Sequence, residues 1–173
     1  REDAGFRLRD LIEQNFADGM SRTKQWPSDS CNFVRRAACL ACMQRKASSD
    51  DDRILAVLRR LETTMADDDL YVRKCCGPFV VGYLGYTYPH LTLPWLQRMA
   101  SLDDLNVRAN CAKAFSQALG RRYPRDGLKL LQGLVDDQRS RVRHAVRGSL
   151  RTILREIDSY ERAEMINKFA GWR

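Results

Sequence analysis

The sequence predicts an all-α fold, namely a right-handed α-solenoid of about four to five antiparallel helix pairs. A Val-Arg dipeptide recurs at near-constant intervals, apolar residues follow each copy at helical spacing, and segments typical of strands are almost absent. The only β-branched and aromatic run, Phe79-Val80-Val81, falls within one of the repeats. The four copies are Val34-Arg35, Val72-Arg73, Val107-Arg108 and Val142-Arg143, at intervals of 38, 35 and 35 residues.

One apolar stripe follows each Val-Arg step. Positions three and four, and then seven and eight, after the valine lie on the same side of a helix as the valine itself. The first pair of positions holds Ala37-Ala38, Cys75-Cys76, Asn110-Cys111 and Ala145-Val146. The second pair holds Ala41-Cys42, Phe79-Val80, Ala114-Phe115 and Ser149-Leu150. Each of the four valines is therefore expected to be buried on the second helix of a pair.

An acidic turn precedes each second helix. Its residues lie three to six positions before the valine, where an Asp side chain can cap the helix and offset its dipole. They are Asp29, Asp67 to Asp69, Asp103-Asp104 and Asp136-Asp137. These turns predict where one helix of a pair ends and the next begins.

Another set of amphipathic stretches predicts the first helices. Their apolar residues are Phe6, Leu8, Leu11 and Ile12, then Ile54, Leu55, Leu58 and Leu61, then Leu93, Leu96 and Met99, then Leu128, Leu131, Leu134 and Val135. Met165, Ile166 and Phe169 are expected to begin a further unit. Residues 1–173 are thus expected to form a single domain with repeats centred on Val34, Val72, Val107 and Val142. The chain opens Arg1-Glu2-Asp3, and we expect it to be a fragment of a longer chain.

The charge is concentrated in the second half of the chain. The 173 residues are about one domain in length, and 44% apolar and 30% charged residues are typical of a globular protein. Residues 1–86 hold 14 basic and 13 acidic side chains, whereas residues 87–173 hold 16 and 9. A one-sided basic surplus attracts polyanions, with nucleic acid first among them. The alternative is that an acidic remainder of a longer chain balances the charge.

The cysteines and the apolar runs bear on compartment and cofactors. Cys31, Cys39, Cys42, Cys75, Cys76 and Cys111 lie in helical patterns and are expected to be buried, reduced thiols of a cytoplasmic protein. Cys39 and Cys42 match half a zinc site, but the adjacent Cys75 and Cys76 point about 100° apart on a helix, so no metal is expected. No Gly-rich phosphate loop or nucleophile elbow is present, and no cofactor is expected.

No apolar run approaches the roughly 18–20 residues of a membrane span, which excludes a membrane-spanning protein and predicts no membrane partner.

The repeat resembles a known family. Antiparallel helices every 35–38 residues, joined by an Asp-rich turn into Val-Arg, resemble the HEAT repeat over about residues 28–155. The segments 72–82 and 106–122 are similar to the DNA alkylation repair (AlkD-like) group of HEAT-like proteins. This resemblance implies basic helices that face nucleic acid. For active members it also implies cofactor-free excision of alkylated purines, by a Trp and an Asp one helical turn apart, an Arg and a further aromatic.

Most of that excision pattern is missing. The position four residues after Trp26 holds Ser30, the position four residues after Trp95 holds Met99, and Trp172 lies too near the end. The family's Arg position, two residues after each valine, holds Arg36, Lys74, Ala109 and His144, of which Arg36 alone matches. The family's aromatic position, six residues after each valine, holds Leu40, Pro78, Lys113 and Gly148. We therefore assign no catalytic residue.

The basic residues fall into two predicted groups. The HEAT-like resemblance implies that the Arg of each Val-Arg step pairs with an acidic turn residue of a neighbouring repeat, which gives a structural ladder of Arg35, Arg73, Arg108 and Arg143. The repeat does not require the other basic residues of the C-terminal half, and these are the candidate nucleic-acid contacts. They are Arg121, Arg122, Arg125, Arg139, Arg141, His144, Arg147, Arg151 and Arg155. A solvated face with counter-ions is the alternative for this second group.

The sequence thus predicts a non-enzymatic binding module. The favoured ligand is nucleic acid, most of all DNA, held through its backbone phosphates by the basic C-terminal half. The first alternative is a protein–protein interaction scaffold within a larger protein, with other domains or subunits as partners. The second alternative is an alkylpurine DNA glycosylase.

Overall fold

Helices form the ordered elements of the chain in this computed structural model, which describes residues 2–45 and 50–168. No strand occurs within those ranges, so the all-α prediction is confirmed there. The N-terminal elements are α1 (Glu2–Gln14), α2 (Phe16–Arg22), the 3₁₀-helix η1 (Trp26–Ser28), α3 (Asn32–Leu40) and α4 (Asp51–Met65). The central elements are α5 (Leu70–Cys75), the π-helix η3 (Cys76–Val81), α6 (Gly82–Thr87), α7 (Pro89–Ser101) and α8 (Leu105–Ala114). The C-terminal elements are α9 (Ala118–Arg122), α10 (Pro124–Gln132), α11 (Ser140–Ile153) and α12 (Ser159–Lys168), and Phe169 lies outside the described residues.

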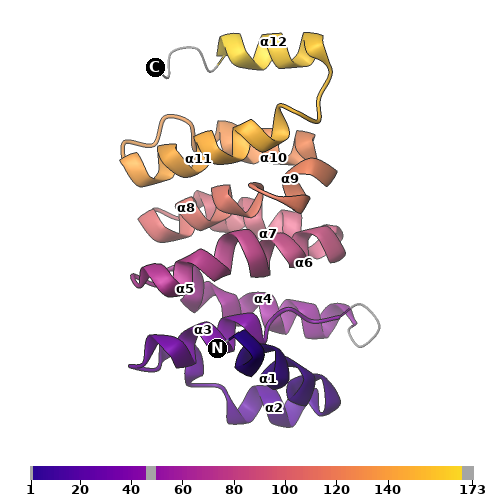
Figure 1. Cartoon of the computed structure of the whole chain (residues 1–173), viewed down its shortest axis with the longest axis vertical. Helices are drawn as coiled ribbons and strands as arrows, with labels where there is room; N and C mark the ends of the chain where they lie inside the picture. The colour runs from indigo at the N-terminus through magenta and orange to yellow at the C-terminus, as the bar shows by residue number, and fades with distance from the viewer. Residues whose placement is uncertain (1, 46–49, 169–173) are drawn as a thin grey trace.

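The helices lie in two layers that follow the chain from one end to the other. Figure 1 shows α3, α5, α8 and α11 one above another toward the viewer, with α4, α7 and α10 behind them. Within the nearer layer α3 packs against α5, η3 against α8, and α8 against α11. In the other layer α7 contacts both α4 and α10. We call the nearer layer the second-helix layer, because each of its helices follows an acidic turn.

Burial of the repeated valines follows this arrangement. Val72, Val107 and Val142 are buried, as predicted. Val34 is only half-buried, which corrects the expectation for the first repeat. Helix α3 lies near the N-terminal end of its layer, where it packs against α1, η1 and α5.

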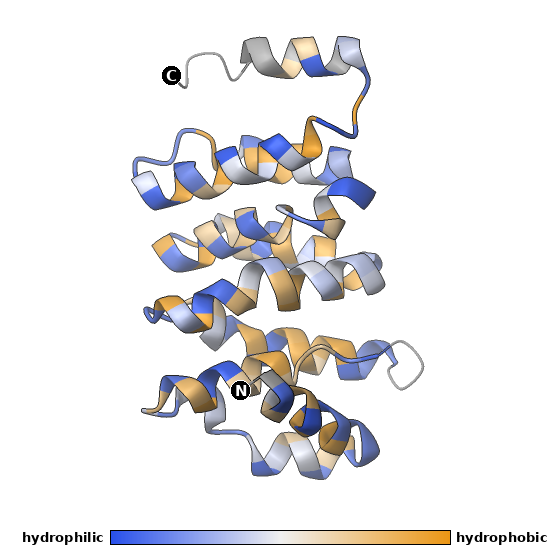
Figure 2. Ribbon diagram, viewed as in Figure 1, coloured by the Kyte–Doolittle hydropathy of each residue, from blue (hydrophilic) through white to orange (hydrophobic). Residues whose placement is uncertain are grey.

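The core runs through the whole stack between the two layers. Its largest fully buried side chains include Leu61 of α4, Leu84 of α6, Phe115 after α8 and Ile153 of α11. Hydrophobic and hydrophilic residues alternate along α8 and α11 in Figure 2, as expected of helices with one face in the core. None of the described helices is long and apolar enough to span a membrane.

The cysteines lie mostly in this core and form no disulfide, and all six fall within the described ranges. Five are buried, as predicted, whereas Cys31 at the N-cap of α3 is exposed and corrects the prediction. Burial raises the pKa of the Cys42 thiol to about 12. Hydrogen bonding with Cys75 and Cys76, together with burial, raises the pKa of the Cys39 thiol well above its ordinary value. Such thiols stay protonated and unreactive at neutral pH.

The π-helix η3 changes which residues face the core. Pro78 has no N–H for the carbonyl of Lys74, four residues earlier, so the helix widens at this point. The wider turn shifts the helical phase, and Phe79 lies 52% exposed although the sequence places it in the apolar stripe. The corresponding residues of the other repeats, Ala41, Ala114 and Ser149, are buried. Phe79 therefore departs from the predicted pattern because of the proline beside it.

Each Val-Arg arginine binds the turn that precedes it. In all four repeats the guanidinium donates to the main-chain carbonyl six residues earlier. The acceptors are Asp29 for Arg35, Asp67 for Arg73, Leu102 for Arg108 and Asp137 for Arg143, at distances of 2.8, 3.2, 2.7 and 3.0 Å. Asp69 and Asp104 complete two of these turns, because their side chains accept the main-chain N–H groups at the starts of α5 and α8.

Two of these arginines also bind the carboxylate of the next turn along the stack. Arg35 Nε donates to Asp67 Oδ2 at 2.6 Å, and Arg108 Nη1 donates to Asp137 Oδ2 at 2.8 Å. Among the described residues Arg73 and Arg143 make no ion pair, and their guanidinium groups bind carbonyls of their own turns alone. This corrects the predicted ladder between repeats, which holds at Arg35 and Arg108 and not at Arg73 and Arg143. The carboxylates of these two ion pairs are shielded from solvent, since the side chains of Asp67 and Asp137 are only 7% and 2% exposed.

Replacing Asp137 by Asn should lower the free energy of unfolding by about 2–3 kcal/mol, since a shielded carboxylate loses charge-assisted hydrogen bonds from Arg108 and Arg139. Urea denaturation at neutral pH measures this difference. The matched control is Asp136→Asn, an exposed neighbour whose replacement should change stability by no more than about 0.5 kcal/mol. Equal stability of the two variants would contradict a structural role for the Asp137 carboxylate.

The Asp137 carboxylate also makes the stability of the fold decrease at acidic pH. Hydrogen bonds from Arg139, and then from Arg108, hold the pKa of Asp137 far below its ordinary value. The stability that ionised Asp137 contributes is fully present above the unfolded-state pKa of about 3.9. It is lost as the pH falls toward the pKa of Asp137 in the folded state. The stability gap between the parent and Asp137→Asn should therefore shrink below about pH 4.

Candidate nucleic-acid interface

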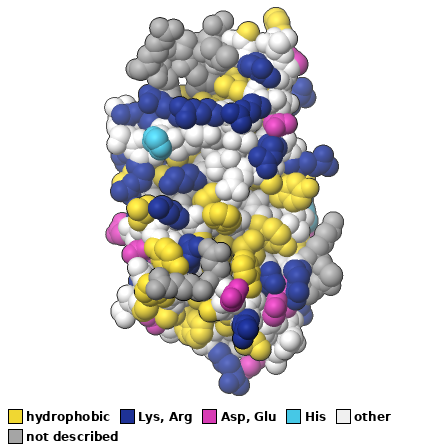
Figure 3. Space-filling model, viewed as in Figure 1, with side chains coloured by type: hydrophobic (Ala, Val, Ile, Leu, Met, Phe, Trp, Pro, Cys, Tyr) yellow, Lys and Arg dark blue, Asp and Glu magenta, His cyan; other side chains and the backbone are white. Residues whose placement is uncertain are grey.

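Helix α11 carries a row of basic side chains on its outer face. Its other face packs into the core through residues such as Val142 and Ile153. The exposed residues are Arg141, His144, Arg147, Arg151 and, just beyond the helix, Arg155, and we call these five residues the α11 basic face. No acidic residue occurs between positions 138 and 155. Figure 3 shows an almost unbroken row of Lys and Arg side chains at the level of α11.

Most of this face has no counter-charge. The side chains of His144, Arg151 and Arg155 make neither a hydrogen bond nor an ion pair with any residue in the described ranges. Arg141 Nη1 donates to the neutral side chain of Asn106, with 2.6 Å between the nitrogen and Oδ1. A hollow of about 430 Å³ lies at the start of the face, and its lining consists of Ser140, Arg141, Arg143, His144 and Arg147. Without a carboxylate in that lining, the hollow is electrostatically suited to an anion.

Arg139 does not belong to this face, which corrects its place among the predicted nucleic-acid contacts. Its Nε and Nη2 atoms bind the two oxygens of Asp137 at 2.8 and 2.6 Å, and Nη2 also lies 3.0 Å from Asp103 Oδ1. Hydrogen bonds to Asp137, together with the charge of Asp103, raise the pKa of Arg139 above its ordinary value. The bidentate pair with Asp137, together with the nearby Asp103 carboxylate, offsets the charge of this guanidinium. Arg139 therefore closes the turn before α11.

The second predicted cluster is mixed in charge. Arg121, Arg122 and Arg125 are exposed around the junction of α9 and α10, and the Arg122 guanidinium lies 5.9 Å from the centre of the Tyr123 ring. The hollow beside them, of about 430 Å³, is also lined by carboxylates. These carboxylates belong to Asp126, Glu156 and Asp158. The cluster is thus a weaker anion site than the α11 basic face.

Two lysines that the sequence analysis did not assign extend the positive field toward α5. Lys74 is exposed and Lys113 is half-buried. Burial lowers the pKa of Lys113, and the charges of Arg73, Arg141 and Lys74 lower it further. In the sequence these lysines occupy the Arg and aromatic positions of the excision pattern, and no spacing relates them to the basic residues of α11. Their shared surface becomes visible only once α5, α8 and α11 are stacked.

Gly148 lies in the middle of the α11 basic face. It is exposed, and a Cβ atom added to it would meet no atom within 4 Å. Glycine inside a helix destabilises it by roughly 0.8–1.0 kcal/mol relative to alanine, so packing does not explain this residue. Its absent side chain lets a ligand approach the helix backbone between the arginines.

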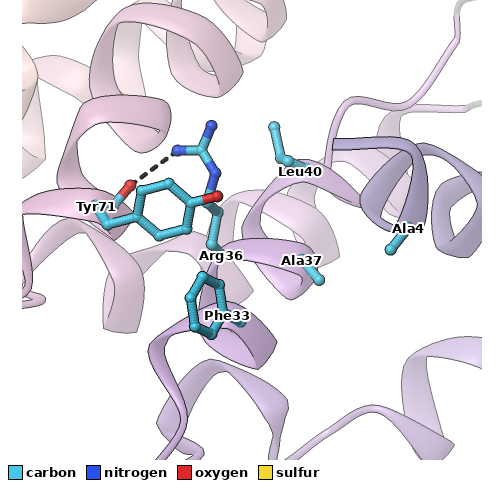
Figure 4. A pocket seen from close by; sticks show the side chains of 6 residues that line it. All are labelled: Ala4, Phe33, Arg36, Ala37, Leu40 and Tyr71. Carbon is cyan, nitrogen blue, oxygen red and sulfur yellow. Dashed lines mark hydrogen bonds between the residues drawn. The ribbon is translucent and has the colours of Figure 1, made fainter. Parts of the chain in front are cut away.

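The residue that matches the excision pattern, Arg36, lines a separate apolar hollow of about 390 Å³ (Figure 4). Its Nη1 donates to the carbonyl of Tyr71 at 2.8 Å, and its guanidinium lies 4.2 Å from the centre of the Tyr71 ring. Phe33 meets the same ring edge-on, with 5.5 Å between the ring centres. The remaining lining residues are Ala4, Ala37 and Leu40, so the hollow has no carboxylate among the described residues.

The tryptophans do not complete that hollow. Trp95 is buried and its Nε1 donates to Glu62 Oε1 at 3.3 Å. Trp26 lies on η1, outside the lining, and Trp172 lies outside the described residues. In the described part of the chain no group of His, Cys, Asp and Glu side chains is arranged to hold a metal ion. Comparison with protein-family models, curated proteins and solved structures found no match to the chain.

Gly148→Ala should raise the free energy of unfolding by about 1 kcal/mol, because alanine is the better helix former and nothing lies near the added methyl group. Gly120→Ala is the contrasting variant. Its Cβ would lie 1.9 Å from the Phe115 carbonyl oxygen, so this change should lower stability by about 2 kcal/mol or more. Urea denaturation of both variants measures the difference. A loss of stability in Gly148→Ala would show that the position is constrained within the folded chain.

Proposed function

We propose that the chain is a right-handed HEAT-like solenoid that binds DNA through its backbone phosphates and catalyses no reaction. The solenoid interpretation is supported by the recurrence of one turn contact in every repeat and by the stacking of the second helices on one another. The buried thiols fit a reducing compartment such as the cytoplasm.

The observation that carries the DNA proposal is the α11 basic face, which holds five basic residues without an acidic residue between positions 138 and 155. Arg147 and Arg151 are one helical turn apart, about 6 Å along the axis, and Arg155 follows at the same sequence spacing. Like charges at this spacing repel one another in an isolated helix, and a bound polyanion relieves that repulsion. Duplex DNA carries one negative charge per about 1.7 Å of its axis, so several phosphates can meet the face at once. Such contacts are independent of base sequence.

A salt titration of DNA binding tests the proposal. With four to six phosphate contacts, the affinity for duplex DNA should fall with a log–log slope of roughly −4 to −5. The double variant Arg147→Ala/Arg151→Ala should make that slope shallower by about two units, because each lost charge releases one counter-ion fewer. Its stability should change by no more than about 0.5 kcal/mol per site, since both side chains are exposed.

Two controls accompany the titration. Arg7→Ala/Lys129→Ala removes two exposed charges on α1 and α10, outside both basic surfaces, and it should leave the slope unchanged. Arg143→Ala removes a turn contact and should lower stability more than it lowers affinity. If the α11 double variant binds with the parent's slope, the basic face is solvated surface and the DNA proposal fails.

Gly148 offers a test that leaves the charge unchanged. Gly148→Gln places a neutral, long side chain among the arginines, and it should weaken DNA binding while the helix becomes no less stable. Filter binding or fluorescence anisotropy at constant salt measures the effect. Unaltered affinity would show that DNA does not approach the backbone of α11.

The alternative of a protein–protein scaffold rests on the apolar N-terminal part of the second-helix layer. Phe33 and Phe79 are about half exposed there, and the hollow beside Arg36 is largely apolar. Exposed apolar surface of this kind is typical of protein interaction sites. A failed salt titration would leave this function as the better supported one.

A glycosylase is the least supported of the three functions, because the hollow beside Arg36 has no carboxylate among the described residues. Incubation with duplexes that contain alkylated purines should release no free base above a heat-inactivated control. Base release that is lost in Arg36→Ala would contradict this expectation and assign a catalytic site to the hollow.

A further inference from the structure

A second anion site is suggested by a hollow that lies away from the α11 basic face. It has a volume of about 260 Å³ and lies where α2 and η1 meet α4. Its lining consists of Met20, Lys24, Pro27, Ser28, Arg59, Arg60 and Thr63. Three of these seven residues are cationic, two carry hydroxyl groups and none is acidic.

Arg60 is the most buried of the three cations. Its side chain is partly buried, and its Nη1 donates to Met20 Sδ at 3.1 Å while Nη2 donates to the Thr23 carbonyl. Its Nε is buried and has no acceptor among the described residues. Burial lowers the pKa of Arg60, and no carboxylate offsets this effect. A partly buried guanidinium without a carboxylate is uncommon, because removing the charge from water is costly unless a partner compensates.

The other polar groups surround this guanidinium from two chain segments. Lys24 and Ser28 come from the turn that includes η1, and Arg59 and Thr63 stand one helical turn apart on α4. Lys24 and Arg59 are exposed, and neither makes an ion pair with a residue in the described ranges. Guanidinium and ammonium groups beside hydroxyl donors are the groups that proteins use to bind phosphate oxygens.

We propose that this hollow binds the phosphate group of a small phosphomonoester. A phosphate ester carries about −1.5 to −2 charges at neutral pH, which matches the excess of cations in the lining. Met20 and Pro27 form an apolar wall against which the organic part of the ester packs. The volume is slightly below the usual range for drug-sized ligands, so the ligand is small. The site is independent of the α11 basic face and does not rest on DNA binding.

Thermal unfolding of the full chain with inorganic phosphate or phenyl phosphate tests the site, with sodium chloride at equal ionic strength as the reference. At a ligand concentration ten times the Kd, the parent should unfold about 3–5 °C higher than in the reference salt. Phenyl phosphate should bind more tightly than inorganic phosphate because of the apolar wall. Equal affinities would overturn the assignment to an ester.

Two double variants locate the effect. Lys24→Gln/Arg59→Gln should lose most of the phosphate-induced shift. Arg7→Gln/Lys129→Gln, which removes the same charge from exposed positions on α1 and α10 outside both proposed sites, should keep it. Circular dichroism should show that both variants are folded, since all four side chains are exposed. The proposal is overturned if phosphate stabilises the parent no more than chloride does, or if the two variants lose the shift equally. The salt slope for DNA is measured separately, so failure of this site leaves the DNA proposal standing, and the reverse also holds.

Discussion

The stack depends on the contact between the arginine of each Val-Arg step and the turn that precedes it. A chain that reverses direction between two helices leaves main-chain carbonyls without helical partners, and these groups must be satisfied elsewhere. In every repeat a guanidinium from the first turn of the second helix reaches back to the carbonyl six residues earlier. The turn is thereby held to the helix that follows it. At Arg35 and Arg108 the same group also binds the adjacent turn, which couples successive repeats.

This use of arginine divides the basic residues of the C-terminal half into two populations. Arg139 and Arg143 satisfy acceptors within the turn before α11 and are only half-exposed. Arg151 and Arg155 have no such acceptor among the described residues, and their charge remains open to solvent. A formal net charge of +8 therefore says less about ligand binding than the subset of charges that the turns do not use.

The helices and the burial of most stripe residues could be predicted from the sequence, because apolar periodicity and Asp caps are local signals. Three features could not be predicted in this way. The charge of Arg139 is offset because Asp103 and Asp137, from two different turns, both reach its guanidinium in the folded stack. Phe79 points outward because one proline changes the helical phase. The lysines Lys74 and Lys113 share a surface only after their helices have packed.

The candidate site was predictable to a similar degree. Arg141, His144, Arg147, Arg151 and Arg155 follow helical spacing, so their common face can be read from the sequence. The hollow around Arg60 carries no such signal, since Lys24 and Arg59 are 35 positions apart and neither lies in the repeat pattern. Sites built from irregular turns need the three-dimensional arrangement before their residues can be grouped.

The widened turn at Pro78 has a consequence for the second-helix layer as a whole. It turns Phe79 outward, near the end of the layer where Phe33 and Tyr71 already place aromatic rings, while α11 presents cations at the opposite end. The two ends of this surface therefore differ, since one end is aromatic and the other is charged. A long ligand whose own two ends differ can match this surface in only one of its two orientations.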